Sequence, residues 1–200
     1  MKLHKFISEQ EYFQKQIRGC IKHWNRRPTA NEQEEETICS FARANGITKP
    51  SIMCHGARCG TEIKLFERFF PKSRVMGTDV CIKKDDTGKV IKWDFHKQKP
   101  EWVGVFDIVY SNTLDHSHTP TECIKVWMDQ VKPEGYLALC WSFRHELKNK
   151  EGDLLPGGDC YGASLQEYME LVEKVGEIKG LLWISFGRHV IIMASPKRKK

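Results

Sequence analysis

One stretch of the sequence decides the fold: Ser51-Ile52-Met53-Cys54-His55-Gly56-Ala57-Arg58-Cys59-Gly60-Thr61. Its first five residues have the apolar character of a buried strand, and a helical pattern begins near Thr61. The two glycines let the backbone approach a ligand closely, and the N-terminus of a helix offers free N–H groups to an anion. The stretch therefore predicts a strand and a helix that are joined by a ligand-binding loop.

Short strands and helices alternate along the chain after this stretch. Helical patterns cover about residues 61–70 and 120–131 and begin again at 165. Strands are expected at 51–55, 74–79, 90–95, 103–110, 136–141, 180–184 and 189–194. Only a short link separates the last two strands, which permits an antiparallel hairpin but no parallel return. This order predicts an α/β domain with a seven-stranded, mostly parallel, doubly wound sheet and an antiparallel C-terminal hairpin.

Residues 1–46 have a helical pattern that Pro28 interrupts. Thr29-Ala30-Asn31-Glu32 looks like a capping box that opens the second helix, and Glu34 to Glu36 are predicted to form its solvated face. A chain of 200 residues fits one domain. We expect N-terminal helices that act as a lid at 1–46, an α/β core at 50–195 and a basic tail at 196–200.

Composition and charge narrow the class of protein. The chain is 40% hydrophobic and 29% charged, with a formal net charge of +6. It has no apolar run long enough to span a membrane and no apolar signal segment, so a soluble, cytoplasmic protein is expected. The eight cysteines include no Cys-x-x-Cys pair. Free thiols are therefore expected rather than disulfides, and no metal site.

Polar residues follow several of the predicted strands, where a doubly wound sheet binds its ligand. Asp79 lies 23 residues after Gly56, the spacing at which such sheets place a carboxylate on ribose hydroxyls. Asp94 can accept from an adenine amino group while Phe95 covers the base. Ser111-Asn112 would face the reactive part of a cofactor. A single Asp at a strand end is also an ordinary turn residue, so the prediction depends on the combination.

The ordered motifs 56–62, 77–79, 93–94, 106–112 and 131–137 resemble those of the class I methyltransferases that use S-adenosylmethionine (SAM). Residues 111–135 resemble the branch with the ubiquinone- and menaquinone-biosynthesis methyltransferases. The resemblance covers about residues 50–195 and implies a Rossmann-like methyltransferase fold with SAM as cofactor. It implies that SAM is bound by His55, Gly56, Arg58, Gly60, Asp79, Val80, Asp94, Phe95, Ser111 and Asn112.

The first loop departs from the family pattern at two positions. Cys54 stands where the family has an acidic residue, and Arg58 stands where it has the middle glycine. The missing acid weakens the usual contact with the methionine amino group. Arg58 either pairs with the methionine carboxylate, for which a guanidinium is well shaped, or points into solvent.

Candidate bases for proton removal from an acceptor follow the fourth core strand. His116 and Asp115 are the predicted catalytic residues, with His118 as a further candidate, since a histidine titrates near neutral pH. Alternatively, these residues cap the helix near Pro120 or form the pocket wall. His145 and Tyr161 either contact the acceptor or belong to a loop without such a role.

The acceptor is predicted mainly by exclusion. Residues 111–114 lack the Asp/Asn-Pro-Pro-aromatic run of adenine-N6 enzymes, and no Pro-Cys nucleophile is present. Cys140 and Trp141 stand where ribose 2′-O enzymes have a lysine. A small molecule, such as a saccharide or metabolite hydroxyl, is favoured over nucleic acid, and the basic ends leave RNA open. A protein acceptor, a nicotinamide-dependent enzyme and a catalytically inactive binding protein are the alternatives.

Overall fold

The computed structural model describes residues 2–23, 31–144, 159–184 and 189–197. Its main sheet has seven strands in the order β4-β3-β2-β5-β6-β9-β8. They are β2 (Ser51–His55), β3 (Arg74–Asp79), β4 (Val90–Lys92), β5 (Phe106–Ser111), β6 (Val131–Ser142), β8 (Gly176–Ile184) and β9 (His189–Pro196). All pairings from β4 to β6 are parallel, and β9 is antiparallel to both of its neighbours. The predicted sheet is confirmed; the link at 185–188 lies outside the described residues.

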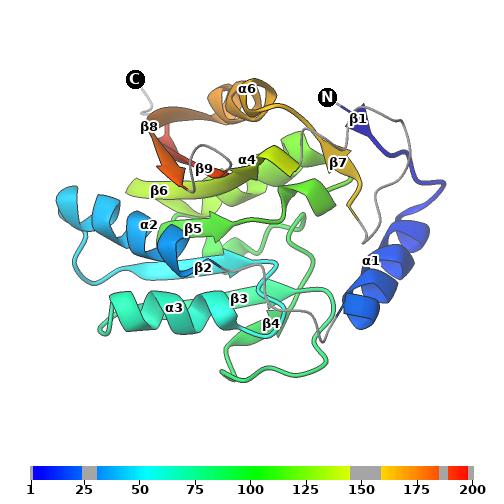
Figure 1. The fold of residues 1–200 in the computed structure, drawn as a ribbon, viewed down its shortest axis with the longest axis horizontal. Helices are drawn as coiled ribbons and strands as arrows, with labels where there is room; N and C mark the ends of the chain where they lie inside the picture. The colour runs from blue at the N-terminus through cyan, green and yellow to red at the C-terminus, as the bar shows by residue number, and fades with distance from the viewer. Residues whose placement is uncertain (1, 24–30, 145–158, 185–188, 198–200) are drawn as a thin grey trace.

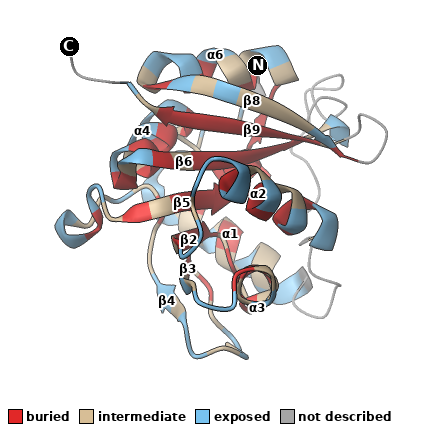
Figure 2. Ribbon diagram, turned by 90° about the vertical axis from the view of Figure 1, so that its left-hand side faces the viewer, coloured by how far each residue is buried: buried red, intermediate tan, exposed pale blue. Residues whose placement is uncertain are grey.

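Helices cover both faces of this sheet (Figure 1). One face carries α2 (Glu32–Ala44) and α3 (Thr61–Phe69), and the other carries α4 (Pro120–Gln130) and α6 (Leu165–Val175). Successive side chains of a strand point to opposite faces. Ile52 and Cys54 of β2 therefore join the core under α2 and α3, while Met53 joins the core under α4 and α6. Figure 2 shows the central strands β6 and β9 buried and the edge strand β8 partly exposed.

The N-terminal segment lies at one end of the main sheet (Figure 1). It contains β1 (Lys2–Leu3) and α1 (Glu9–His23), and β1 pairs with β7 (Tyr161–Gly162) in a separate two-stranded sheet. The hydroxyl of Tyr12 on α1 donates to the carbonyl of His116, 3.1 Å away. Because His116 follows β5, this bond places α1 over the carboxyl ends of the strands.

The second N-terminal helix, α2, belongs to the core instead. Asn31 is its N-cap, with a side chain that accepts from the N–H of Gln33; Thr29 and Ala30 lie outside the described residues. Glu34 and Glu35 were predicted to be solvated, but they are 2% and 0% exposed. They share the face of Ile38 and Ala42, at helical spacing, and that face packs on the sheet.

Five strands differ from their predicted bounds: β5, β8 and β9 begin or end a few residues away from them, and the differences at β4 and β6 bear on the site. The third strand, β4, ends at Lys92, so Asp94 and Phe95 lie in the turn that follows. β6 begins at Val131 directly after α4, five residues before the predicted start, and residues 132–135 form an irregularity in its pairing with β5. A Cβ on Gly135 would lie 2.7 Å from the Asp107 carbonyl, which explains the glycine at this close approach. Within the described residues, no helix has the length and apolar character needed to cross a membrane.

Candidate functional site

The loop after β2 wraps over the end of β3 with a strained backbone. Gly56, Arg58 and Gly60 all have positive φ angles, at 78°, 42° and 81°. The N–H groups of Gly56 and Ala57 both donate to the carbonyl of Thr78. A Cβ on Gly56 would lie 2.5 Å from the side chain of Thr113, so only glycine fits at this position. The loop is therefore packed closely against Thr78 and Thr113, and its role in ligand binding stays a prediction.

Asp79 is joined directly to this loop. One carboxylate oxygen accepts from the backbone N–H of Arg58 at 3.0 Å, and the other accepts from that of Cys81 at 2.8 Å. Burial raises the pKa of Asp79, and the two backbone bonds act in the opposite direction. Val80 is half-buried beside it. The structure therefore places Asp79, the residue predicted to bind the ribose hydroxyls, next to the glycine loop.

Asp94 lies in a polar cluster that the sequence pattern did not reveal. Its Oδ1 accepts from the N–H of His96 and lies 2.7 Å from His96 Nδ1, and His96 Nε2 lies 2.8 Å from the hydroxyl of Ser117. Burial would raise the pKa of Asp94, but the His96 hydrogen bonds outweigh it and hold the pKa below its usual value. His96 thus fixes the carboxylate in an ionised state.

Two side chains predicted to bind the cofactor lie in the core. The His55 imidazole is buried between Thr78 Oγ1 at 2.8 Å and Gln130 Oε1 at 2.9 Å, and it stacks on Trp127. Burial lowers the pKa of His55 to about 4. Phe95 is 7% exposed and packs in the core under α4. These side chains turn toward α4, because strand alternation and the short β4 direct them there, so the predicted cofactor contacts of His55 and Phe95 would have to come from their backbone atoms.

The backbone of His55 still lies at the strand ends. Its carbonyl accepts from the hydroxyls of Ser111 and Thr113, at 3.2 and 3.4 Å. Ser111 is buried, and Asn112 is half-buried in the bend after β5. These bonds tie the ends of β2 and β5 together beside the glycine loop, so Ser111 helps to fix the geometry of the loop. Asn112 is more exposed than Ser111 and is therefore the more accessible of the two to a ligand.

His116 is held between two segments that lie far from it in the sequence. Its Nδ1 lies 3.1 Å from Gln16 Oε1 of α1, and its Nε2 lies 3.5 Å from Asp159 Oδ1. The side chain is 32% exposed, whereas Asp115 is buried. Asp115, His116 and Asp159 each place one potential metal-ligand atom within 4.8 Å of the other two. Carboxylate and imidazole groups in such an arrangement can also hold a metal ion.

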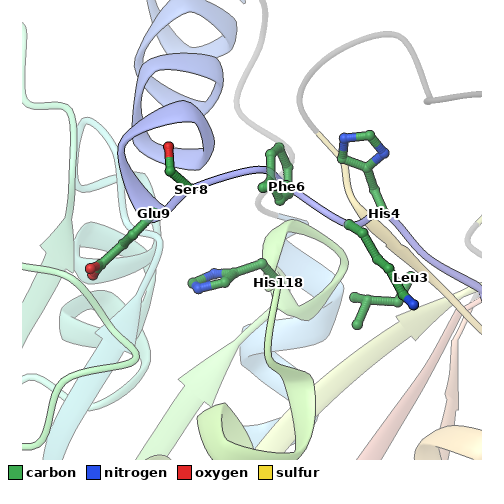
Figure 3. A pocket seen from close by; sticks show the side chains of 7 residues that line it. Leu3, His4, Phe6, Ser8, Glu9 and His118 are labelled. Carbon is green, nitrogen blue, oxygen red and sulfur yellow. The ribbon is translucent and has the colours of Figure 1, made fainter.

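An open pocket of about 450 Å³ lies between the chain before α1 and His118 (Figure 3). Figure 3 shows the imidazole of His118 opposite Phe6 and Glu9. Tyr161, considered as an acceptor contact, is instead buried and stacked on Tyr168. His145 lies outside the described residues. All eight cysteines are free thiols.

No protein-family model and no curated protein sequence matches the chain. Several solved structures match it in fold. The 1,6-didemethyltoxoflavin-N1-methyltransferase of Burkholderia thailandensis, with bound 1,6-didemethyltoxoflavin and S-adenosylhomocysteine, aligns at 14% identity and a TM-score of 0.75, over 98% of this chain and 93% of its own. The chain has the Rossmann-like methyltransferase fold. In this fold the ligand crevice lies beyond the carboxyl ends of the parallel strands, where the glycine loop and Asp79 meet.

Other solved proteins with the methyltransferase fold differ in their activity. Human N-acetylserotonin methyltransferase in complex with SAM has 17% identity and a TM-score of 0.58, over 96% of this chain and 57% of its own. The [4+2]-cyclase SpnF has 12% identity and a TM-score of 0.59, over 80% of this chain and 81% of its own. At these identities the likeness establishes the fold, and the activity must be argued from the site.

Proposed function

We propose that this chain is a SAM-dependent methyltransferase that acts on a small-molecule acceptor. The observation that carries the proposal is the bond between the Arg58 N–H and Asp79, which joins a left-handed glycine loop to a strand-end carboxylate. That pair is suited to a nucleoside with a polar chain attached. The fold is shared with two methyltransferases whose structures contain SAM or S-adenosylhomocysteine.

The residues present fit SAM in chemical type. Each oxygen of the Asp79 carboxylate has a lone pair beyond the one that its backbone bond uses, so it can accept from ribose hydroxyls. The ionised Asp94 is suited to the adenine amino group, and Asn112 to the reactive end. When bound, SAM would supply an activated methyl group on a sulfonium.

His116 is the residue best placed to remove a proton from the acceptor. The Gln16 carbonyl oxygen accepts from Nδ1, which leaves Nε2 with its lone pair. Asp159, 3.5 Å from Nε2, stabilises the imidazolium that forms when this nitrogen takes a proton. Asp115 lies next to it as a second carboxylate. Because the donor methyl is already activated, alignment and this proton transfer are all that the chain must contribute.

The acceptor class is inferred from the size and character of the open pocket. Its volume of about 450 Å³ lies in the range of small-molecule sites, and of the candidate bases His118 lines it while His116 does not. The resemblance of residues 111–135 to the quinone-biosynthesis branch, and the substrates named for the two methyltransferases, agree with a small acceptor. We assign the lid function expected of residues 1–46 to α1 alone, since α2 lies in the core. A cytoplasmic location is part of the same proposal.

Incubation with labelled SAM and cell fractions tests the proposal. Small molecules, RNA and protein are supplied as separate fractions, and the label is followed into each. Label in the small-molecule fraction is expected. Label in RNA or protein alone would contradict the small-molecule acceptor. If SAM binds but no fraction receives the label, the chain is better described as a SAM-binding protein that does not transfer the methyl group. The [4+2]-cyclase shows that a protein with this fold can have a different activity.

A further inference from the structure

Cys54 occupies the position where the resemblance implies an acidic residue. Its thiol is fully buried, and burial followed by the charges of Glu62 and Glu35 raises the pKa of Cys54 well above its ordinary value. A neutral thiol contributes no charge toward a cation. The carboxylates that act on Cys54 come from other elements: Glu35 from α2 and Glu62 from α3.

These carboxylates belong to a buried cluster under α2. Glu34, Glu35 and Glu62 are 2%, 0% and 6% exposed. Glu34 is paired with His189, whose Nδ1 lies 2.9 Å from Glu34 Oε1. Among the described residues, no cationic side chain forms an ion pair with Glu35 or Glu62 within 4 Å. A buried carboxylate without a cation is costly, and a cationic ligand would relieve that cost.

A second buried side chain points to the same place. The hydroxyl of Tyr110 lies near the Glu35 carboxylate and is itself buried, at 1% exposure. The Tyr110 hydroxyl and the two side-chain oxygens of Glu35 have no hydrogen-bond partner of normal geometry among the described residues. A buried polar atom without a partner destabilises the folded protein, so the two Glu35 oxygens and the Tyr110 hydroxyl together favour a ligand with several N–H donors.

The cluster adjoins the crevice that would hold the cofactor. Cys54 and Tyr110 lie near the carboxyl ends of β2 and β5, on the face covered by α2 and α3. Glu62 is the second residue of α3, directly after the glycine loop, and it is close enough to Arg58 and Asp79 to feel both charges. The carboxyl groups therefore form a continuous series from Asp79, through Glu62, to Glu35.

We propose that Glu62 and Glu35 bind the ammonium group of the methionine portion of SAM, in place of the acid that Cys54 lacks. The inference rests on the proposed function. An ammonium offers three N–H donors to the oxygens of the two carboxylates and of Tyr110. The amino-acid end of the cofactor would thus be held by α2 and α3 rather than by the end of β2.

Proton release accompanies this binding. Burial raises the pKa of Glu35 to about 8 and that of Glu62 to about 7, so Glu35 is mostly protonated at pH 7.5. An adjacent ammonium favours the charged carboxylate and expels the proton. The titratable and charged groups around the pair are Glu34 and Cys39 of α2, Cys54 of β2, Arg58 of the glycine loop, Asp79 of β3, Tyr110 of β5, Cys140 of β6 and His189 of β9.

Calorimetry with three ligands tests the assignment: SAM, S-adenosylhomocysteine and 5′-methylthioadenosine. The first two carry the ammonium, and the third has the nucleoside and sulfur without it. The proteins are the wild type, Glu62→Gln, Glu35→Gln and the control Glu36→Gln, which changes an exposed residue of the same helix. Titrations at pH 7.5 in buffers of different ionisation enthalpy measure the protons released.

The proposal predicts that each of Glu62→Gln and Glu35→Gln weakens SAM and S-adenosylhomocysteine at least tenfold and leaves methylthioadenosine unchanged. Proton release with SAM falls in Glu35→Gln to the smaller part that Glu62 contributes, and Glu36→Gln matches the wild type. Unchanged SAM affinity in both variants, or an equal loss for methylthioadenosine, would overturn it. If Asp79→Ala weakens SAM while both glutamate variants bind normally, the proposed function stands and this assignment fails. If the wild type binds none of the ligands, both fail.

Discussion

The backbone N–H of Arg58 donates to the carboxylate of Asp79 at 3.0 Å, so the glycine loop after β2 and the end of β3 form one unit. Arg58 has a φ of 42°, a conformation that costs about 1–2 kcal/mol for a residue with a side chain. The Asp79 bond compensates for part of this strain. The loop conformation and the strand-end carboxylate are therefore coupled, and a change to one disturbs the other.

Gly56→Ala is expected to destabilise the protein and to weaken SAM binding. The substitution places a side chain in a left-handed backbone conformation. It also causes a clash, because three side-chain atoms of Thr113 lie within 3 Å of the added Cβ. Gly46→Ala is the matched control, because its φ of 84° is similar and nothing lies within 4 Å of the added Cβ. In urea unfolding, Gly56→Ala should lose about 1–3 kcal/mol more than Gly46→Ala. Equal losses would show that Thr113 yields to the added methyl group.

His116→Gln is expected to lower kcat by about 10²–10⁴-fold and to leave SAM affinity unchanged, because the side chain acts on the acceptor proton. Gln16→Ala, which removes the Nδ1 partner, should lower kcat less and shift the pH at which the rate is half-maximal. Steady-state rates over pH 5–9, with SAM affinity measured separately, check both. If kcat is the same in His116→Gln as in the wild type, His116 has no role in catalysis.

The methyl transfer rate is expected to be unaffected by a chelator. Gln16 holds Nδ1 of His116, and the proposed base acts through the lone pair of Nε2, a role that needs no metal ion. Rates before and after treatment with EDTA, followed by addition of Mg²⁺ or Zn²⁺, check this. A loss of activity that one of these ions restores would instead assign a metal to Asp115, His116 and Asp159.

The buried His55 should make the protein sensitive to acid. Burial lowers its folded-state pKa to about 4, below the value of about 6.5 in the unfolded chain, so the unfolded chain takes up the proton first. The stability present above about pH 6.5 is lost as pH falls toward 4, by up to roughly 3 kcal/mol. Denaturant unfolding of wild type and His55→Gln over pH 4–7 measures this. A difference between them that does not change with pH would contradict it.

Glu35 should have the opposite effect. Burial raises its folded-state pKa to about 8, so the unfolded chain loses the proton first and stability falls as pH rises from about 4.5 to 8. Glu35→Gln, which cannot ionise, should therefore be more stable than wild type at pH 8.5, by up to a few kcal/mol. The exposed Glu36→Gln should leave the pH dependence unchanged. A parallel pH profile for Glu35→Gln and wild type would place the Glu35 pKa near its ordinary value.

Much of the fold could be predicted because its signals are local. Alternation of apolar runs and helical stripes located all seven strands of the main sheet, and the short link fixed the last hairpin. The two-residue strands β1 and β7 have no period to detect. The burial of Glu34 and Glu35 was missed because three consecutive glutamates suggest solvent, although their spacing from Ile38 and Ala42 matches one helix face.

The candidate site could be predicted only where it follows strand ends. Gly56, Asp79 and Asp94 were proposed from their place at or just after the ends of predicted strands. Alternation indicated that His55 and Cys54 point to opposite faces, but not which face adjoins the crevice. Gln16 lies 100 residues from His116, and no pattern in the sequence relates the two. The partners of the predicted residues therefore required the tertiary structure.

Calorimetric titration of SAM into wild type and Asp79→Ala tests the central claim most directly, with NAD as a second ligand. Asp129→Ala is the control, because this exposed carboxylate lies near the end of α4, away from the carboxyl ends of the strands. Saturable binding of SAM but not of NAD is predicted, with at least a tenfold loss in Asp79→Ala and none in Asp129→Ala. No affinity for SAM, or an affinity that Asp79→Ala leaves unchanged, would contradict the account.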